Sequence, residues 1–478
     1  MSVKFISREI IIGSLPLGNG HPVRIQSMTN TPTLDTKATA EQILRLVKSG
    51  CELVRITAAN IREAENLKNI RDVLLEKGID IPLIADVHFQ PKAAEIAARV
   101  VEKVRINPGN YSGSHHKGKK YSEADYQKEL TQTAQNLKPL LHICKHHNTA
   151  LRIGINHGSL SDRILYRYGN TSKGMVASAM EFIRICRENN FEKMTLSLKA
   201  STVSTMIEAN RMLVNEMQKN NMNYPLHLGV TEAGNGMEGR IKSAMGIGSL
   251  LAEGVGDTIR VSLTEAPEKE IPVARKLVEF YGRPKQNAVI QAKYSAYRDI
   301  PESQRQAVVL TDEMKPLSLE KTILLLSYPN LSYNDLILRA AVDFNLTYEK
   351  RKAEGLLIQN GLQSNTEQLR ELALQILQAH GLRYSKTEFV ACPSCGRTHF
   401  DIEKELNRVK SRLGNIKGLK IAVMGCLVNG PGEMADADYG FVGSAYGKVD
   451  LYKGKNIVYK NLPKEKALDK LEKLIRER

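Results

Sequence analysis

The sequence predicts an α/β protein built on an N-terminal (β/α)8 TIM barrel, with a small inserted α/β module and a C-terminal α+β domain. Between residues 22 and 282, short apolar runs typical of strands alternate with helical stretches such as 38–50, 61–78 and 201–218. Such alternation favours a parallel sheet. The strand-like runs are residues 22–28, 51–57, 81–87, 102–108, 150–156, 193–201, 226–231 and 258–263. This number of units, in about 260 residues, fits a (β/α)8 barrel.

An open, doubly wound sheet is the alternative fold for this part of the chain. It would be favoured by a G-x-G-x-x-G turn after the first strand, and the sequence has none. Residues 8–23 read as a hairpin, which we expect to plug the floor of the barrel.

The 478 residues are too many for one core, so we expect three domains. We place the substrate-binding barrel at 1–282, an insertion at 283–384 and a cysteine-containing domain at 385–478. In the insertion, residues 319–330, 334–345 and 365–381 look like helices. The segment 111–126 extends a loop of the barrel, and its two histidines are expected to belong to a polar surface.

Charge and hydropathy argue against a nucleic-acid-binding protein, a membrane protein and a secreted protein. The net charge is +16, from 68 Lys and Arg against 52 Asp and Glu, which suits either nucleic acid or a multiply anionic small molecule. The basic residues are spread along the chain rather than gathered in one stripe, so we do not expect nucleic-acid binding. No apolar run approaches the ~20 residues of a membrane span, and no secretory leader is evident. We therefore expect a cytoplasmic protein with reduced thiols.

Cations stand at the carboxyl ends of five predicted strands, where barrel enzymes place their active sites. Charge inside a buried parallel strand is costly unless it faces a site. Arginine matches phosphate oxygens in a bidentate way. We therefore expect a ligand with two or more phosphate charges. The candidate binding residues at these ends are Arg55, Arg105, Asn107, Arg152, Asn156, Lys199, Ser201, Arg260 and Ser262.

Three further residues at the same strand ends are candidates for proton chemistry. Glu232 and Asp86 are the acids, and the surrounding cations should keep both ionised. Glu232 could hold a substrate hydroxyl or carry a proton, and His88 is a second proton carrier beside Asp86.

The cysteines fall into two groups. Cys51, Cys144 and Cys186 stand singly in apolar segments and are expected in the core. Cys392 and Cys395 form a Cys-Pro-Ser-Cys-Gly knuckle, and Cys426 follows about thirty residues later. A turn after Cys426 brings Glu433 back toward it. Three thiolates and a carboxylate suit a 4Fe-4S cluster with one exchangeable corner.

Two other functions remain open at this point. A zinc site, with His399 as its fourth ligand, would be structural. It would suit a barrel transferase acting on a phosphorylated or pterin-like substrate. A basic RNA-binding protein with a zinc ribbon is the second alternative, but a ribbon needs a second knuckle.

The chain resembles the 4-hydroxy-3-methylbut-2-enyl diphosphate synthase family. The matching motifs are QSMTNT at Gln26, VRIT around Arg55, ADVHF around Asp86, RINPGN at Arg105, RIGINHGSLSDR at Arg152, SLKAS at Ser197, HLGVTEAG at His227, GIGSLLAEGVGDTIRVSL at Gly246, ACPSCGR at Ala391 and GCLVNGPGE at Gly425. They span about three-quarters of the chain.

The resemblance implies a reaction of the non-mevalonate route to isoprenoids. Members open the ring of 2-C-methyl-D-erythritol 2,4-cyclodiphosphate with two electrons from ferredoxin or flavodoxin, and an oxygen leaves as water. By resemblance, Arg55, Arg105, Arg152 and Lys199 bind the diphosphate, and Glu232 is the barrel acid. The family's 4Fe-4S ligands correspond to Cys392, Cys395, Cys426 and Glu433.

The insertion departs from the compact bacterial members and resembles the chlamydial and plant-type branch. At about a hundred residues it is too short for a second full barrel. In compact homodimers, the cluster domain of one subunit caps the barrel of the other. The insertion would let one chain close on its own barrel, so the sequence leaves a homodimer and self-closure as alternatives.

Overall fold

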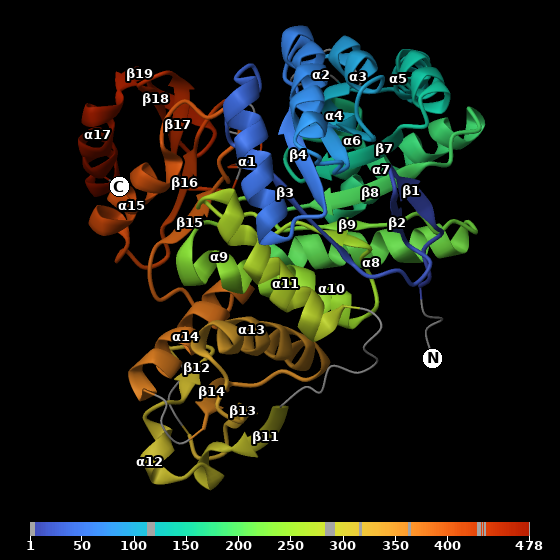
Figure 1. Ribbon diagram of the computed structural model, residues 1–478. Coiled ribbons are helices and arrows are strands. Elements are labelled where there is room, and N and C mark those ends of the chain that lie inside the picture. The colour runs from blue at the N-terminus through green and yellow to red at the C-terminus, as the bar shows by residue number, and fades with distance from the viewer. Residues whose placement is uncertain are drawn as a thin grey trace.

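The computed structural model describes residues 5–111, 120–282, 292–314, 318–361, 365–427, 432, 434 and 436–477. A barrel, an inserted module and a C-terminal domain follow one another along the chain (Figure 1). Within the described ranges, no helix has the length and apolar character needed to cross a membrane.

Eight parallel strands form the predicted barrel. They are β3 (Arg24–Met28), β4 (Leu53–Thr57), β5 (Leu83–Asp86), β6 (Lys103–Ile106), β7 (Ala150–Asn156), β8 (Met194–Lys199), β9 (His227–Leu228) and β10 (Thr258–Ile259). The sheet order is β8-β7-β6-β5-β4-β3-β10-β9. A parallel bridge between Leu196 and Leu226 joins its two edges, and Leu196 N donates to Pro225 O at 3.0 Å. The barrel fold is confirmed.

Helices surround the barrel, and polar residues begin several of them. Asp35 caps α1 (Thr36–Ser49) and Asn60 caps α2 (Ile61–Glu76) by accepting backbone N–H groups. The other barrel helices are α3 (Pro91–Ala97), α4 (Pro108–Tyr111), α5 (Glu123–His146), α6 (Asp162–Tyr168), α7 (Ser172–Glu188), α8 (Val203–Lys219), α9 (Gly236–Ser243), α10 (Ser249–Ala252) and α11 (Glu270–Tyr281), with a π-helical turn at Ala244–Gly248 between α9 and α10. Half of the extended loop at 111–126, including both of its histidines, lies outside the described residues.

The N-terminal hairpin closes the amino-end of the barrel, as predicted. Its strands are β1 (Ile10–Ile12) and β2 (Leu15–Leu17). Ile12 and Leu17 are fully buried and pack with Leu53, Ile84 and Ala150, which lie near the starts of β4, β5 and β7. The floor is therefore sealed by apolar contacts, and the opposite, carboxyl-end rim is left for chemistry.

The insertion contains a four-stranded mixed sheet, ordered β11-β13-β14-β12. The strands are β11 (Ala292–Ala296), β12 (Val309–Leu310), β13 (Thr322–Tyr328) and β14 (Gly355–Asn360), and helices α13 (Tyr333–Lys350) and α14 (Thr366–His380) pack on the sheet. Two predicted helices are confirmed. The third, 319–330, is wrong, because Thr322–Tyr328 is a strand between β11 and β14. A short apolar run does not distinguish a buried strand from a helix by its periodicity.

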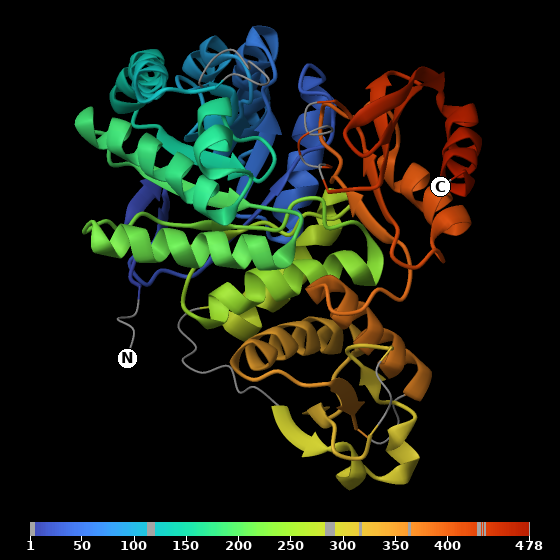
Figure 2. The same cartoon turned by 180° about the vertical axis from the view of Figure 1, so that it is seen from behind.

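The C-terminal domain is a five-stranded sheet lying beside the barrel (Figures 1 and 2). Its strands are β15 (Glu388–Ala391), β16 (Lys420–Met424), β17 (Tyr439–Ala445), β18 (Lys448–Lys453) and β19 (Asn456–Pro463), with helices α15 (Ile402–Leu413) and α17 (Lys464–Arg476). The first three strands are parallel, so Cys392 and Cys426, which follow β15 and β16, emerge at the same edge. That edge faces the barrel rim.

Candidate active site

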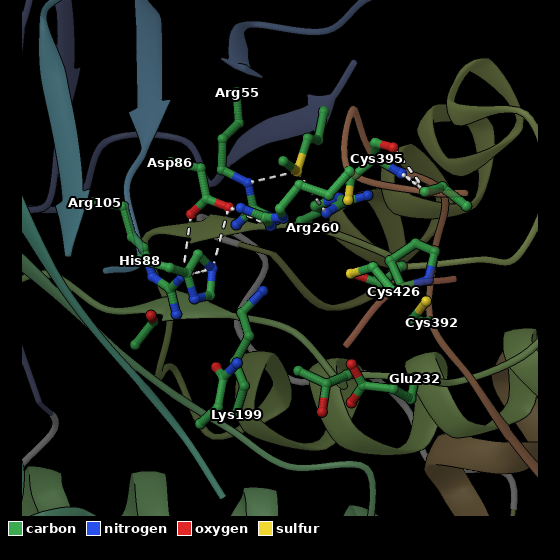
Figure 3. Close-up of a pocket in the computed structure, with 18 of the residues that line it drawn as sticks. Arg55, Asp86, His88, Arg105, Lys199, Glu232, Arg260, Cys392, Cys395 and Cys426 are labelled. Atoms are coloured by element: carbon green, nitrogen blue, oxygen red, sulfur yellow. Dashed lines mark hydrogen bonds and ion pairs between the residues drawn. The ribbon is translucent and has the colours of Figure 1, made fainter. Parts of the chain in front are cut away.

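One pocket lies between the carboxyl-end rim of the barrel and the C-terminal domain (Figure 3). The barrel side carries cations, and the opposite side carries the three grouped cysteines. The lining residues are Met28, Arg55, Asp86, His88, Arg105, Arg152, Asn156, Ser197, Lys199, Thr231, Glu232, Arg260, Ser262, Cys392, Pro393, Cys395, Arg397, Thr398 and Cys426. The parallel barrel strands converge here, so residues far apart in sequence share one site.

Asp86, at the end of β5, lies close to several positively charged side chains on one side of the pocket. Arg105 Nη1 donates to Asp86 Oδ1 at 3.2 Å and also to His88 Nε2. Arg152 Nη2 lies 4.0 Å from the same carboxylate. Burial alone would raise the pKa of Asp86, but Arg55 and Arg105 hold it well below its usual range. Asp86 is therefore ionised.

Arg260 and Arg55 lie on the side of the rim formed by β10 and β4. Arg260 Nε and Nη2 donate to the two oxygens of Glu270, at 3.2 and 3.1 Å. Arg55 Nε donates to the Met28 sulfur at 3.0 Å. Arg260 thus has a carboxylate partner of its own, whereas Arg55 is oriented by a neutral group.

Positive charge exceeds negative charge in this pocket. Burial, followed by Arg55 and Arg105, lowers the pKa of Arg152, and burial with Arg55 and Arg152 lowers the pKa of Lys199. The Arg152 Nε and Nη1 atoms are buried without a hydrogen-bond partner among the described residues. Unpaired buried donors are costly, and an anion carrying several oxygens would satisfy them.

Glu232 lines the pocket from the loop after β9. Its backbone is left-handed, with φ +50°, and its side chain is 2 % exposed. The Oε2 atom has no hydrogen-bond partner within the part of the chain that the structure describes. Strained backbone at a buried polar residue is typical of functional sites. Glu232 is therefore available to a substrate hydroxyl or proton.

The cysteine side of the pocket contains Cys392, Cys395 and Cys426, none of them in a disulfide. Gly425 N donates to Cys392 Sγ at 3.3 Å. Burial raises the pKa of the Cys392 thiol, and the neighbouring Cys426 and Cys395 thiols raise it further. Among the described residues, no three Cys, His, Asp or Glu side chains form a ready site for one metal ion.

The C-terminal domain is attached to the barrel of its own chain. Ala391 N donates to Glu232 O at 3.2 Å, within a parallel bridge between Ala233 and Ala391. The Thr264 hydroxyl donates to the carbonyls of Ala391 and Cys392, both at 3.1 Å. These contacts fix the start of the cysteine knuckle against the rim beside β9 and β10.

Comparison with known proteins agrees with this architecture. The model of the GcpE TIM-barrel domain matches residues 7–275, and that of the GcpE protein C-terminal domain matches residues 388–477. The chain belongs to the GcpE family. This GcpE protein is 41% identical to "4-hydroxy-3-methylbut-2-en-1-yl diphosphate synthase (flavodoxin)" of Phocaeicola vulgatus, over 98% of the chain and 97% of that protein. The same-named proteins of Leptospira interrogans and Protochlamydia amoebophila are each 36% identical over 98% of the chain, covering 96% and 95% of their lengths.

Solved structures match the GcpE chain more distantly. One is the sialic acid synthetase of Leptospira borgpetersenii, with 11% identity and a TM-score of 0.38 over 59% of this chain and 93% of that one. Another is 7,8-dihydropteroate synthase from Vibrio fischeri, with 12% identity and a TM-score of 0.35 over 57% of this chain and 97% of that one.

The structure brings most of the predicted site residues of this GcpE protein into one pocket. Asn107 and Ser201 are not among the described lining residues. Asn107 instead donates to the Ser159 hydroxyl in the loop after β7, at 3.0 Å, and accepts from Gly109 N in its own loop, at 3.1 Å. Glu433 lies outside the described residues, so its predicted role as a ligand stays a prediction.

Sequence reasoning missed two buried cations, of which one lines the pocket. Arg397, directly after the cysteine knuckle, lines the pocket. Lys103, at the start of β6, is fully buried, and its Nζ atom has no partner among the residues described. Arg397 could have been predicted, because a basic residue directly follows the Cys-Pro-Ser-Cys-Gly knuckle. Lys103 was harder to predict, because it begins a strand, whereas the site residues lie at strand ends.

Proposed function

We propose that this GcpE protein reductively opens 2-C-methyl-D-erythritol 2,4-cyclodiphosphate to (E)-4-hydroxy-3-methylbut-2-enyl diphosphate. The substrate takes up two electrons and two protons, the ring C–O bond to phosphate breaks, and one oxygen leaves as water. The observation that carries the proposal is that the cation-rich rim and the three cysteines line a single pocket. The relatives that match over nearly the full chain are named as synthases of this diphosphate.

The barrel cations supply binding. Arg55, Arg105, Arg152 and Lys199 surround the place where the diphosphate would lie, and Arg260 and Ser262 extend the same wall. The surplus of positive charge, with the unpaired donors of Arg152, suits two adjacent phosphates. Asn156, also in the lining, adds an amide to the wall.

Proton chemistry falls to the polar residues beside these cations. Glu232 is the best placed, because it lines the pocket near Cys392 (Figure 3) and its Oε2 atom has no hydrogen-bond partner among the described residues. His88 Nε2 accepts a hydrogen bond from Arg105, which also donates to Asp86. We assign Glu232 the proton of the leaving oxygen, whereas His88 and Asp86 pair with cations of the rim.

The cysteines fit a 4Fe-4S cluster better than a single zinc ion. The three cysteines line the same pocket as the cations, where a redox cluster would be used and a structural zinc ion would not. In a cluster, each thiolate binds a different iron. Cys392, Cys395 and Cys426 would hold the cluster, with Glu433 as the fourth ligand. Such a cluster supplies electrons one at a time beside the bound ring.

The electron donor of this chain is proposed from its relatives. Their names specify flavodoxin, which is one of the two carriers expected from the sequence. The zinc-containing transferase is disfavoured because the thiols face the cation-lined pocket, whereas a structural zinc site needs no access to substrate.

A cysteine variant tests this function. Cys426→Ser should lose both the brown absorbance of the anaerobically reconstituted protein and its turnover of the cyclodiphosphate. Cys144→Ser, a buried barrel thiol outside the pocket, is the matched control and should keep both. Full activity of Cys426→Ser would exclude the proposed role of the cysteines.

A further inference from the structure

Arg397 is the one cation that the C-terminal domain adds to the described lining of the pocket. It reaches across to the barrel, where its Nη2 donates to Asp86 Oδ2 at 3.3 Å. Their side chains are 12 % and 2 % exposed, so this ion pair is shielded from solvent. It joins two domains through residues that are 311 positions apart in the chain.

This contact lies across the pocket from the other attachments of the domain. Those attachments involve β15 and α15. Lys242 Nζ donates to Glu388 at 3.3 Å and to Phe389 O at 3.1 Å, and Lys410 Nζ donates to Asn235 at 2.8 Å. They meet the barrel near β9 and β10, whereas Asp86 ends β5. In the sheet order, β4 and β3 separate β5 from β10. The Arg397–Asp86 pair therefore fastens the far side of the pocket.

The loop that carries Arg397 is closely seated on the rim. A Cβ atom added to Gly396 would lie 2.9 Å from the Thr31 carbonyl oxygen and 3.5 Å from Thr57 Cβ. The Thr398 hydroxyl accepts from Cys395 N at 3.0 Å and donates to Cys395 O at 2.8 Å. The backbone on both sides of Arg397 is thus fixed, and movement of this residue is left to its long side chain.

The ion pair with Asp86 leaves some hydrogen-bond donors of Arg397 without a partner among the described residues. Nε and Nη1 of Arg397 are buried and have no hydrogen-bond partner in the described ranges. Asp86 also faces Arg105 and Arg152, so one carboxylate serves three guanidinium groups. A diphosphate group between them would satisfy more of these donors than Asp86 does, because it offers more oxygens.

We propose that Arg397 is a movable diphosphate-binding residue, held by Asp86 while the pocket is empty of substrate and transferred to a phosphate when substrate binds. Asp86 is then a positioning residue that takes the place of the substrate anion and keeps the C-terminal domain closed on the barrel. The inference rests on the proposed function only in that the pocket binds a diphosphate.

Binding of inorganic diphosphate tests the proposal without any turnover. Calorimetric titration of the full, anaerobically reconstituted chain should give an at least tenfold higher Kd for Arg397→Gln, with part of the loss restored in Arg397→Lys. Asp86→Asn should bind at least as tightly as the unchanged protein, because a competing anion has been removed. Arg412→Gln, which removes a cation of the same domain outside the pocket, is the control and should leave the Kd unchanged.

Small-angle scattering gives a second readout that does not depend on catalysis. Without diphosphate, both Arg397→Gln and Asp86→Asn should have a larger radius of gyration than the unchanged chain. Added diphosphate should close Asp86→Asn again but not Arg397→Gln. If Asp86→Asn does not fold, the diphosphate Kd values of Arg397→Gln and Arg397→Lys test the proposal.

Two results would overturn the proposal. One is an Arg397→Gln Kd within twofold of the unchanged protein, and the other is a folded Asp86→Asn chain that binds diphosphate ten times more weakly. Absence of cyclodiphosphate turnover in the unchanged protein would count against the proposed function and would leave these binding results standing.

Discussion

At the scale of single residues, the most constrained position of the site is Glu232. A left-handed backbone costs a non-glycine residue about 1–2 kcal/mol, and the buried Oε2 atom adds the penalty of an unpaired polar group. Neighbouring structure maintains this conformation, since the Glu232 carbonyl accepts from Ala391 N of the adjoining domain. A residue kept at this cost is expected to act in the reaction.

Glu232→Gln tests that role. The change keeps shape and burial but removes the proton-carrying group, so we expect turnover to fall by about 10²-fold or more. The cluster absorbance and the thermal midpoint should stay close to those of the unchanged protein. Turnover that is unaltered in steady-state assays would remove Glu232 from the mechanism.

His88 makes stability depend on pH. Burial, with the Arg105 and Arg397 charges, lowers the pKa of His88 from 6.5 to about 3. Between these values the unfolded chain binds a proton that the folded chain does not, so the free energy of unfolding should fall as pH decreases below about 6.5.

Urea unfolding at several pH values between 4 and 7.5 measures this slope. His88→Gln should reduce the slope, because it removes the group that titrates only in the unfolded chain. His21, a half-buried histidine near the N-terminal hairpin, provides the control variant His21→Gln. Equal slopes for His88→Gln and the unchanged protein would contradict the account of His88.

The charged rim could be predicted from the sequence, because the strand ends of a barrel converge. The direction of each side chain could not be predicted in this way. Asn107 and Arg105 stand two positions apart at the end of one strand, yet Asn107 bonds to Gly109 and to Ser159 of the next loop instead of lining the pocket. Arg397 escaped notice because its partner, Asp86, belongs to another domain, and no local pattern relates the two.

At the scale of elements, the barrel strands were predictable and the insertion was less so. Barrel strands are buried on both faces, so their apolar runs are long and repeat with the helices. The β13 run, TILLLSY, is just as apolar, but no regular alternation surrounds it. Its partner strand β14 follows only after α13, so strand pairing could not be inferred from nearby residues.

The insertion packs on the barrel where a glycine permits close approach. Gly248 ends the π-helical turn before α10, and a Cβ atom added there would lie 2.4 Å from Val342 Cγ2 on α13. Asn345 on the same helix donates to the Ser249 hydroxyl at 3.1 Å. Helix α13 is therefore seated directly on the barrel surface.

Gly248→Ala should destabilise this junction. Overpacking of this kind costs about 1–3 kcal/mol, and Val342→Ala, introduced together with it, should recover part of the loss by removing the clashing methyl group. Unfolding by urea of both single variants and the double variant gives the coupling energy. Strict additivity would mean that Gly248 and Val342 do not form the contact that seats the insertion.

At the scale of the whole molecule, barrel and cysteine domain of one chain build the site together. The insertion lies beside both of them. Asn345 links it to the barrel, and Glu313 links it to the C-terminal domain through Lys417 at 3.2 Å. Of the two arrangements that the sequence left open, the structure has the chain closed on its own barrel. The domain limits at residues 282 and 384, and association as a homodimer, stay predictions.

Mixing two inactive variants tests self-closure. Arg152→Gln disables the barrel half, and Cys426→Ser disables the cysteine half. Because each site needs both halves from one chain, co-refolded mixtures should remain inactive. Sites shared between subunits would instead restore about a quarter of the activity through mixed dimers.

The central claim is that the pocket between rim and cysteines performs a reductive ring opening. Anaerobic incubation of the reconstituted protein with 2-C-methyl-D-erythritol 2,4-cyclodiphosphate and reduced flavodoxin, followed by chromatography of the products, tests it most directly. We predict that (E)-4-hydroxy-3-methylbut-2-enyl diphosphate accumulates, with two electrons consumed per ring opened. Unchanged cyclodiphosphate in the presence of fully loaded protein and reduced donor would contradict the account.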